Sequence, residues 1–205
     1  MKRSALPYMV LSMFVAVAFA GCATMGQMPG QQAKPPIITL ERVDIANIQP
    51  FYMTPRIDFK DCNNPGTTGT YGYSSTLSLA YILNIQNPNG FPVMLDEMTF
   101  TTAFDGFDVN TPFVYEDQWI PAGKTNQVRV VVTNEAFNTM VSLMVGSIWA
   151  TKIKEMGTTQ AAVVKKWWTE VGDFSFPITV NNWTATFVCP DGTSVLAYFK
   201  GKFPK

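Results

Sequence analysis

The stretch from residue 76 to residue 89 constrains the fold more than any other part of the chain. Apolar residues occupy every second position from Leu77 to Ile85, and this period of two is typical of a β-strand with one buried face. The strand must end at Asn87-Pro88-Asn89, because proline cannot donate to a β-ladder and asparagine readily bonds its own backbone in turns. This stretch therefore predicts a β-rich fold.

Several other segments show strand patterns separated by turns. Strands are predicted at residues 37–48, 91–104, 128–133, 174–188 and 193–203. Irregularities are expected at Glu41-Arg42 and at Asp96-Glu97. At Asp96-Glu97 the apolar residues change from odd-numbered to even-numbered positions, so a bulge is needed to keep them on the same face of the strand. Turns are expected at Asp105-Gly106, at residues 120–123 and at residues 190–192, where a Pro-Asp-Gly sequence sets the backbone angles that a tight turn requires.

Residues 134–171 depart from the β pattern and predict a helical insertion. Phe137, Met140, Val141, Met144, Val145 and Ile148 recur at helical spacing, which predicts one amphipathic helix that ends near Gly157. A second helix, with Thr158 as its N-cap, places Val164, Trp167, Trp168 and Val171 on one stripe. The two stripes are expected to cover an open end of the β-fold, and the lysines beside the tryptophans leave open a contact with a membrane interface or a hydrophobic ligand.

The N-terminus has the layout of an export signal. Lys2 and Arg3 precede an apolar run from Met9 to Ala20, which is short for a membrane span. Phe19-Ala20-Gly21-Cys22 resembles the lipobox of bacterial lipoproteins, which implies cleavage before Cys22 and its acylation with palmitate-type chains. Ala23 in place of aspartate implies sorting to the outer membrane, with the domain facing the periplasm. We expect a signal peptide at residues 1–21, a flexible tether at 22–36 and one folded domain at 37–205.

The order of the elements resembles a known family. A strand, the Asn87-Pro88-Asn89 turn, a returning strand, an Ile120-Pro121-Ala122 turn and a valine-rich strand follow one another as in the water stress and hypersensitive response (WHy) domain of the folded late embryogenesis abundant proteins. The resemblance covers residues 37–132 and resumes near Trp183. It implies a fibronectin III/immunoglobulin-like antiparallel β-sandwich, which agrees with the many short strands and frequent turns.

Charge and residue types narrow the chemistry. Without Lys2 and Arg3, thirteen basic residues face fifteen acidic ones, a net charge of 13 − 15 = −2, so a basic footprint for nucleic acid is not expected. The chain contains no histidine, which removes Ser-His and Cys-His nucleophile pairs. Its carboxylates lie mainly beside turns. We expect neither an enzyme nor a metal or cofactor site.

Two cysteines remain once Cys22 carries lipid. An even pair in an oxidising compartment predicts a disulfide between Cys62 and Cys189. On the chain-entropy model a loop of this length would stabilise the fold by about 4 to 5 kcal/mol. The alternative is two buried free thiols.

Three functions are consistent with these features. The family resemblance implies a non-enzymatic protein that protects client proteins or the envelope during desiccation, cold or osmotic stress. A second hypothesis is a lipid- or hydrophobic-ligand-binding module, with contacts from Phe137, Met144, Ile148, Trp167 and Trp168. A third is a structural subunit of an envelope assembly, which requires an exposed apolar patch on the helices.

Overall fold

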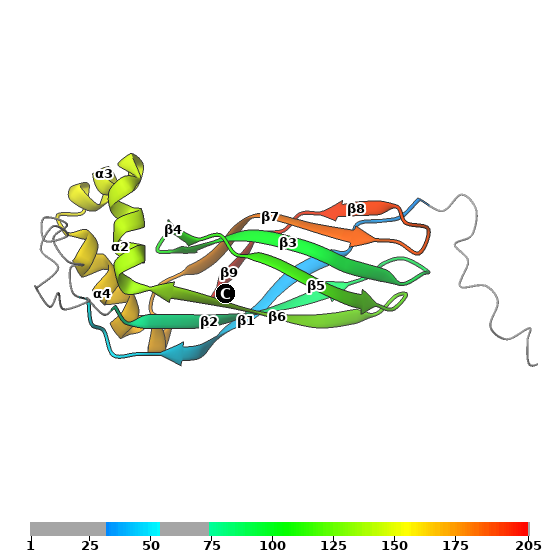
Figure 1. Cartoon of the computed structure of the whole chain (residues 1–205), viewed down its shortest axis with the longest axis horizontal. Helices are drawn as coiled ribbons and strands as arrows, with labels where there is room; N and C mark the ends of the chain where they lie inside the picture. Colours follow the sequence, from blue (N-terminus) through cyan, green and yellow to red (C-terminus); the bar gives the residue numbers. More distant parts are fainter. Residues whose placement is uncertain (1–31, 54–73, 205) are drawn as a thin grey trace, which may run out of the picture.

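The computed structural model describes residues 32–53 and 74–204, which form an antiparallel β-sandwich with a helical insertion (Figure 1). One sheet has three strands in the order β1-β2-β6. The other has six: β4-β3-β7-β8 are neighbours, β5 also pairs with β3, and β9 also pairs with β7. The strands are β1 (Ile37–Ile48), β2 (Thr76–Gln86), β3 (Val93–Phe104), β4 (Phe107–Asn110), β5 (Phe113–Ile120), β6 (Thr125–Glu135), β7 (Ile178–Val188), β8 (Ser194–Ala197) and β9 (Gly201–Phe203).

The helical insertion covers one end of the sandwich, as predicted (Figure 1). We call residues 136–173 the helical cap. It consists of α2 (Ala136–Val145), α3 (Ser147–Glu155), α4 (Gln160–Glu170) and the 3-10 helix η3 (Val171–Asp173). No helix in residues 32–53 and 74–204 is long and apolar enough to cross a membrane.

The predicted irregularities and turns are present. The register between β1 and β2 shifts between Leu40 and Arg42. The register of β3 against β5 and against β7 shifts between Leu95 and Glu97. The β3–β4 turn at residues 105–106 has two positive φ angles, 51° and 76°, as a two-residue hairpin turn of right-handed twist requires. The segment predicted as one strand at 193–203 is divided into β8 and β9, and β7 begins at Ile178 rather than at residue 174. Phe174 has a φ of 47° and ends the 3-10 helix η3, so the chain is not yet in the extended conformation of a strand there.

Strand β2 was predicted to be half-buried, and this is wrong for its centre. Ala80 and Ile82 lie on its outer side and are nevertheless buried. In the register, Ile82 lies between Arg42 of β1 and Arg129 of β6, and long side chains on neighbouring strands cover a central strand with their alkyl stems. The alternating pattern therefore identified the strand but not its central position.

Tyr81 lies at the centre of the core, between the sheets. Its ring contacts Phe100 edge-on at 5.7 Å, and Phe100 stacks on Trp183 at 4.9 Å. Burial raises the pKa of the Tyr81 hydroxyl above its ordinary value, and the neighbouring Thr102 hydroxyl partly opposes this shift. The Tyr81–Thr102 contact lacks full hydrogen-bond geometry, and no other described residue pairs with the Tyr81 hydroxyl.

Tyr81→Phe is expected to change the free energy of unfolding at pH 7 by less than about 1 kcal/mol, because the lost hydroxyl is buried without a full partner. The wild type keeps its full stability below about pH 10, where the unfolded phenol begins to ionise. Above that pH the folded state still holds the proton, so stability falls by up to about 1.4 kcal/mol per pH unit. The phenylalanine variant has no hydroxyl to ionise at this position, so its stability lacks this part of the alkaline decrease. Urea unfolding from pH 7 to 11 checks the difference, and equal alkaline slopes would contradict it.

The helix predicted from Asn134 to Gly157 is interrupted at Gly146. Gly146 has a φ of −73° and a ψ of 105°, so α2 ends there and α3 begins after it. A Cβ atom at this position would lie 2.8 Å from Trp149 Cδ1, so glycine allows the Trp149 ring to pack across the break. The apolar spacing from Phe137 to Ile148 predicted a continuous helix through this position.

The orientation of α2 also differs from the prediction. The helix buries Ala136, Thr139 and Leu143, and much of the predicted inward face points to solvent. The first turn is fixed by the two residues that precede β2, because the Ala136 amide donates to the Ser75 carbonyl at 2.9 Å and the Phe137 amide donates to Ser74 Oγ at 2.7 Å. These contacts set the rotation of the helix, which its apolar periodicity could not reveal.

Helix α4 packs as its stripe predicted, although Thr159 rather than Thr158 caps it by accepting from the Ala162 amide. Trp167 is fully buried, with its ring 5.5 Å from Phe104 and 5.8 Å from Phe107. Its Nε1 donates to Asp105 Oδ2 at 3.0 Å. The β3–β4 turn therefore attaches the helical cap to the six-stranded sheet.

Candidate functional site

The Asn87-Pro88-Asn89 tripeptide joins three segments at the end of the sandwich opposite the helical cap. Both asparagines are buried. Asn87 Nδ2 donates to the carbonyls of Phe91 at 2.8 Å, Ile120 at 3.1 Å and Pro121 at 3.3 Å. Asn87 Oδ1 accepts from the backbone and side-chain amides of Asn89, both at 3.0 Å. All of these polar groups are used within the fold, so the motif holds loops together.

The N-terminal segment is held by the same motif, which corrects the predicted tether boundary. The Lys34 amide donates to Asn89 Oδ1 at 2.8 Å, and Asn89 Nδ2 donates to the Lys34 carbonyl at 2.9 Å. Pro36 is buried. Residues 34–36 are therefore part of the fold, whereas composition alone placed them in a flexible tether.

The lipidation and disulfide predictions fall largely outside the described residues. Cys22 and Cys62 both lie there, as do the signal peptide and residues 22–31 of the tether. Cys189 is buried and is a free thiol in this structure. Acylation at Cys22 and pairing of Cys62 with Cys189 therefore stay predictions.

The five residues predicted to contact a ligand or membrane do not share one surface. Trp167 and Trp168 are buried, and Phe137 is partly buried. Met144 and Ile148 are exposed. The tryptophan rings thus fill the space between the helical cap and the sheets, and only the two exposed residues remain available to an external partner.

One group of exposed aliphatic residues lies where α2 passes into α3. We call Val141, Met144, Val145 and Ile148 the outer row. Val145 is 80% exposed and Ile148 is 73% exposed, on a part of the chain that buries its opposite side against the sandwich. Grouped exposed aliphatic side chains, unlike single ones, are a feature of contact surfaces.

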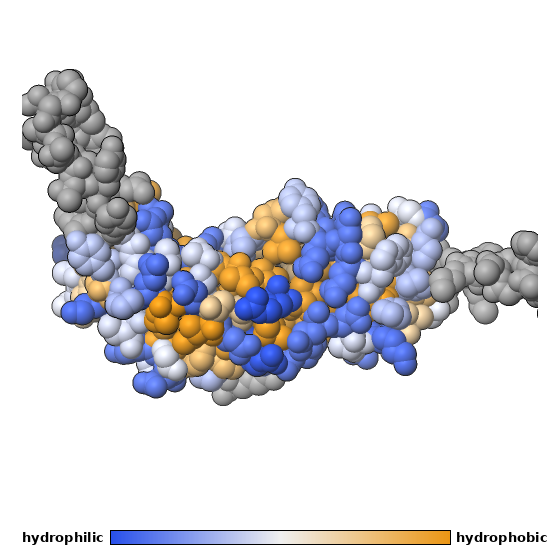
Figure 2. All heavy atoms as spheres, turned by 60° about the horizontal axis from the view of Figure 1, so that its bottom comes forward, coloured by the Kyte–Doolittle hydropathy of each residue, from blue (hydrophilic) through white to orange (hydrophobic). Residues whose placement is uncertain are grey.

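The outer face of the three-stranded sheet carries a different, mixed surface. Figure 2 brings this side of the molecule forward and shows apolar areas interleaved with hydrophilic side chains. Val131 of β6 and Ile37 of β1 are exposed, while Arg42 forms ion pairs with Glu41 and Asp44. Charged groups divide the apolar surface here, so this face is a weaker candidate for an apolar contact than the outer row.

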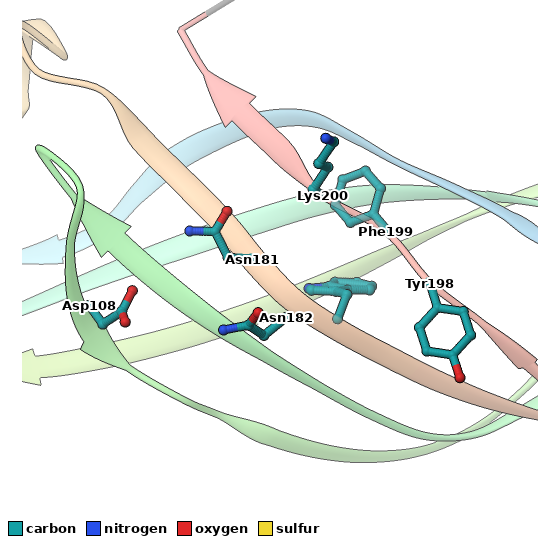
Figure 3. Close-up of a pocket in the computed structure, with 7 residues that line it drawn as sticks. Asp108, Asn181, Asn182, Tyr198, Phe199 and Lys200 are labelled. Carbon is teal, nitrogen blue, oxygen red and sulfur yellow. The ribbon is translucent and has the colours of Figure 1, made fainter.

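A second candidate site is an open groove of about 830 Å³ along β7 (Figure 3). It is lined by Asp108 of β4, by residues 181–183 of β7 and by residues 198–200, which connect β8 to β9. In Figure 3 the Asn181 and Asn182 side chains extend to the side on which Asp108 lies, and Tyr198 lies at the other end. The groove therefore combines amide, carboxylate and aromatic groups.

The local backbone creates this groove. Asn182 has a φ of 51°, and the β3–β7 register shifts between Thr99 and Thr101 at the same place, which is the geometry of a β-bulge. The site was not predicted from the sequence. The signal was the Asn181-Asn182 pair, because asparagine tolerates a left-handed conformation better than other non-glycine residues.

Within residues 32–53 and 74–204, no three His, Cys, Asp or Glu side chains gather as a metal-ligand set. The structure thus offers two surfaces for function: the apolar outer row on the helical cap and the polar groove on the six-stranded sheet.

The fold defines the class of this protein as an antiparallel β-sandwich with a helical insertion. No protein-family model matches the sequence, and no curated protein matches it. Among solved structures, it is similar to a protein from Arabidopsis thaliana with 9% identity and a TM-score of 0.47, covering 88% of this chain and 90% of that one.

Two further solved structures are similar to this chain. A protein from Archaeoglobus fulgidus has 10% identity and a TM-score of 0.37, covering 82% of this chain and 98% of that one. A candidate late embryogenesis abundant (LEA) protein has 10% identity and a TM-score of 0.34, covering 95% of this chain and 79% of that one. Likenesses at this level assign no function to the chain.

Proposed function

We propose that this protein is a non-enzymatic lipoprotein that protects other proteins during desiccation, cold or osmotic stress. The observation that carries the proposal is the outer row, whose apolar side chains are exposed on the folded helical cap. The WHy-like order of strands and turns around Asn87-Pro88-Asn89 supports the stress-related role. Anchoring through acyl chains at Cys22 in the outer membrane belongs to the same proposal.

The outer row suits weak and transient contacts. Its four side chains form a small apolar surface, and a small surface binds partners briefly rather than permanently. Partly unfolded clients expose apolar segments that would otherwise associate with each other. By covering such segments for a short time, the helical cap reduces aggregation without nucleotide or cofactor.

The double variant Val145→Ser/Ile148→Ser tests the proposal. These two side chains are the most exposed of the outer row, so the change removes apolar surface without opening a core cavity. We expect the full chain, purified in detergent, to raise the activity that lactate dehydrogenase retains after drying and rehydration. The double variant should lose at least about half of that protection, because it lacks the contact surface.

Tyr115→Ser is the matched control, since Tyr115 is 77% exposed on β5, outside the helical cap. It should protect as well as the wild type. Urea unfolding of all three proteins would show whether each is folded. Equal protection by the wild type and a folded double variant would overturn the assignment to the outer row.

The same observation favours a second candidate, a structural subunit of an envelope assembly. An assembly partner would cover the outer row permanently rather than transiently. Crosslinking in cells grown with and without osmotic stress distinguishes the two. One partner in constant stoichiometry through a cysteine introduced at Met144 favours the assembly, whereas many partners that appear under stress favour protection.

A further inference from the structure

We propose that the groove along β7 binds a neutral saccharide. This inference is independent of the stress-protective role, because it rests on the six-stranded sheet and not on the helical cap. The site is the opening formed by Asp108, Asn181, Asn182 and the segment from Tyr198 to Lys200. Its volume of about 830 Å³ lies within the range of small-molecule sites, about 300–1,000 Å³.

The groove exists because the β-ladder is interrupted. Along the edge away from β3, the C-terminal part of β7 pairs with β8, ending at Ala185–Ala197, and the N-terminal part pairs with β9, ending at Val180–Gly201. Between these pairs, residues 198–200 have no register partner in β7. Gly201 fixes the far side of the gap, because a Cβ there would lie 2.8 Å from Leu40 Cβ. Close packing therefore holds the opening in place at the Gly201 end.

Polar groups in the groove remain available. The side chains of Asp108, Asn182 and Tyr198 make no hydrogen bond to any described residue, and Asn181 uses its Nδ2 in one 3.3 Å bond to Thr179. An amide both donates and accepts, while a carboxylate accepts. A sugar hydroxyl also both donates and accepts, so a polyhydroxylated ligand can satisfy all of these groups at once.

The aromatic side of the groove suits the apolar face of a sugar ring. Tyr198 is 74% exposed, and the next residue, Phe199, is held edge-on against Trp183 at 4.9 Å. Trp183 is buried, and its Nε1 has no hydrogen-bond partner among the described residues. A rigid aromatic surface beside amide groups provides contact area at a low cost in side-chain entropy.

Charge and geometry argue against other ligand classes. Asp108 and Lys200 carry opposite charges, so the groove does not select an anion or a cation by net charge. A lipid chain would leave the carboxylate and amides unpaired, which costs free energy. An extended peptide needs a longer free strand edge than the gap between β8 and β9 offers.

Isothermal titration of the full chain in detergent with maltose and with chitotetraose tests the proposal. We expect saturable binding of at least one of the two saccharides. Tyr198→Ala should weaken it by about tenfold, because it removes the exposed ring. Asn182→Gly removes an amide while tolerating the positive φ, and it should weaken binding by a smaller factor. Tyr115→Ala is the control, since this tyrosine has similar exposure on another strand.

The two saccharides also distinguish the type of sugar. Binding of maltose alone indicates a preference for α-linked glucose, and binding of chitotetraose alone indicates a preference for β-linked N-acetylglucosamine. Saturable binding that Tyr198→Ala weakens and Tyr115→Ala does not supports the site. The proposal is overturned if neither saccharide shows saturable binding up to about 10 mM, which corresponds to a binding free energy of roughly −3 kcal/mol. Binding that is insensitive to both groove variants would also overturn it.

Discussion

Trp167→Ala is expected to lower the free energy of unfolding by about 4 kcal/mol, the largest effect of any single substitution considered. The side chain is fully buried among Phe104, Phe107 and Phe176, so its removal leaves a large cavity. The substitution also removes the donor to Asp105 Oδ2. Since domains are stable by about 5–15 kcal/mol, the variant should lie close to its unfolding transition. Urea unfolding followed by circular dichroism measures the change.

Trp119→Ala provides the matched comparison. This tryptophan is exposed on β5, and its loss should cost less than about 1 kcal/mol. Lys166→Ala removes only the ion pair with Asp105, which is partly exposed to solvent, so its effect should also be small. If Trp167→Ala lowered the free energy of unfolding no more than Trp119→Ala does, the helical cap would not contribute to the cooperative core.

Asn87→Ala is expected to lower the free energy of unfolding by about 3 kcal/mol, because buried partners left without a hydrogen bond cost about 1–3 kcal/mol each. The carbonyls of Phe91 and Ile120 would lose their donor, and the Asn89 amides would lose their acceptor. Urea unfolding measures the loss. Because Asn89 holds Lys34, hydrogen exchange at the Lys34 amide should also become faster.

Asn126→Ala is the control for the asparagine prediction. Its Nδ2 makes one 2.8 Å bond to the Trp119 carbonyl at an exposed position, so the cost should stay below about 1 kcal/mol. Two outcomes would show that the hydrogen bonds of Asn87 and Asn89 are not what stabilises this end of the sandwich. One is a similar decrease in the free energy of unfolding in Asn87→Ala and Asn126→Ala, and the other is an unchanged exchange rate at the Lys34 amide.

Much of the fold could be predicted because its determinants are local. The alternation from Leu77 to Ile85 and the Asp105-Gly106 turn depend on neighbouring residues only, and both are confirmed. The burial of Ala80 and Ile82 was not predictable in this way, because it depends on side chains from β1 and β6 that are remote in the sequence.

The candidate sites were less predictable for the same reason. Helical periodicity shows that an apolar stripe exists but not which way it points, and the hydrogen bonds of Ala136 and Phe137 to Ser75 and Ser74 decided that for α2. The groove depends on the bulge at Asn182, which the asparagine pair signals, and on the interruption of the ladder between β8 and β9, which no local pattern encodes. Only Met144 and Ile148 of the predicted contact residues remain exposed.

The N-terminal segment and the helical cap lie at opposite ends of the sandwich, and this arrangement sets the height of the outer row above a membrane to which the N-terminus is attached. Residues 32–36 enter the sandwich at the end away from the helices (Figure 1). With Cys22 acylated as proposed, the lipid would lie on the side of the sandwich away from the helical cap. The eleven residues of β2 span about 35 Å. An upright domain would therefore present the outer row several nanometres above the lipid, facing the interior of its compartment. Shortening the tether would lower this height without altering any surface of the folded domain.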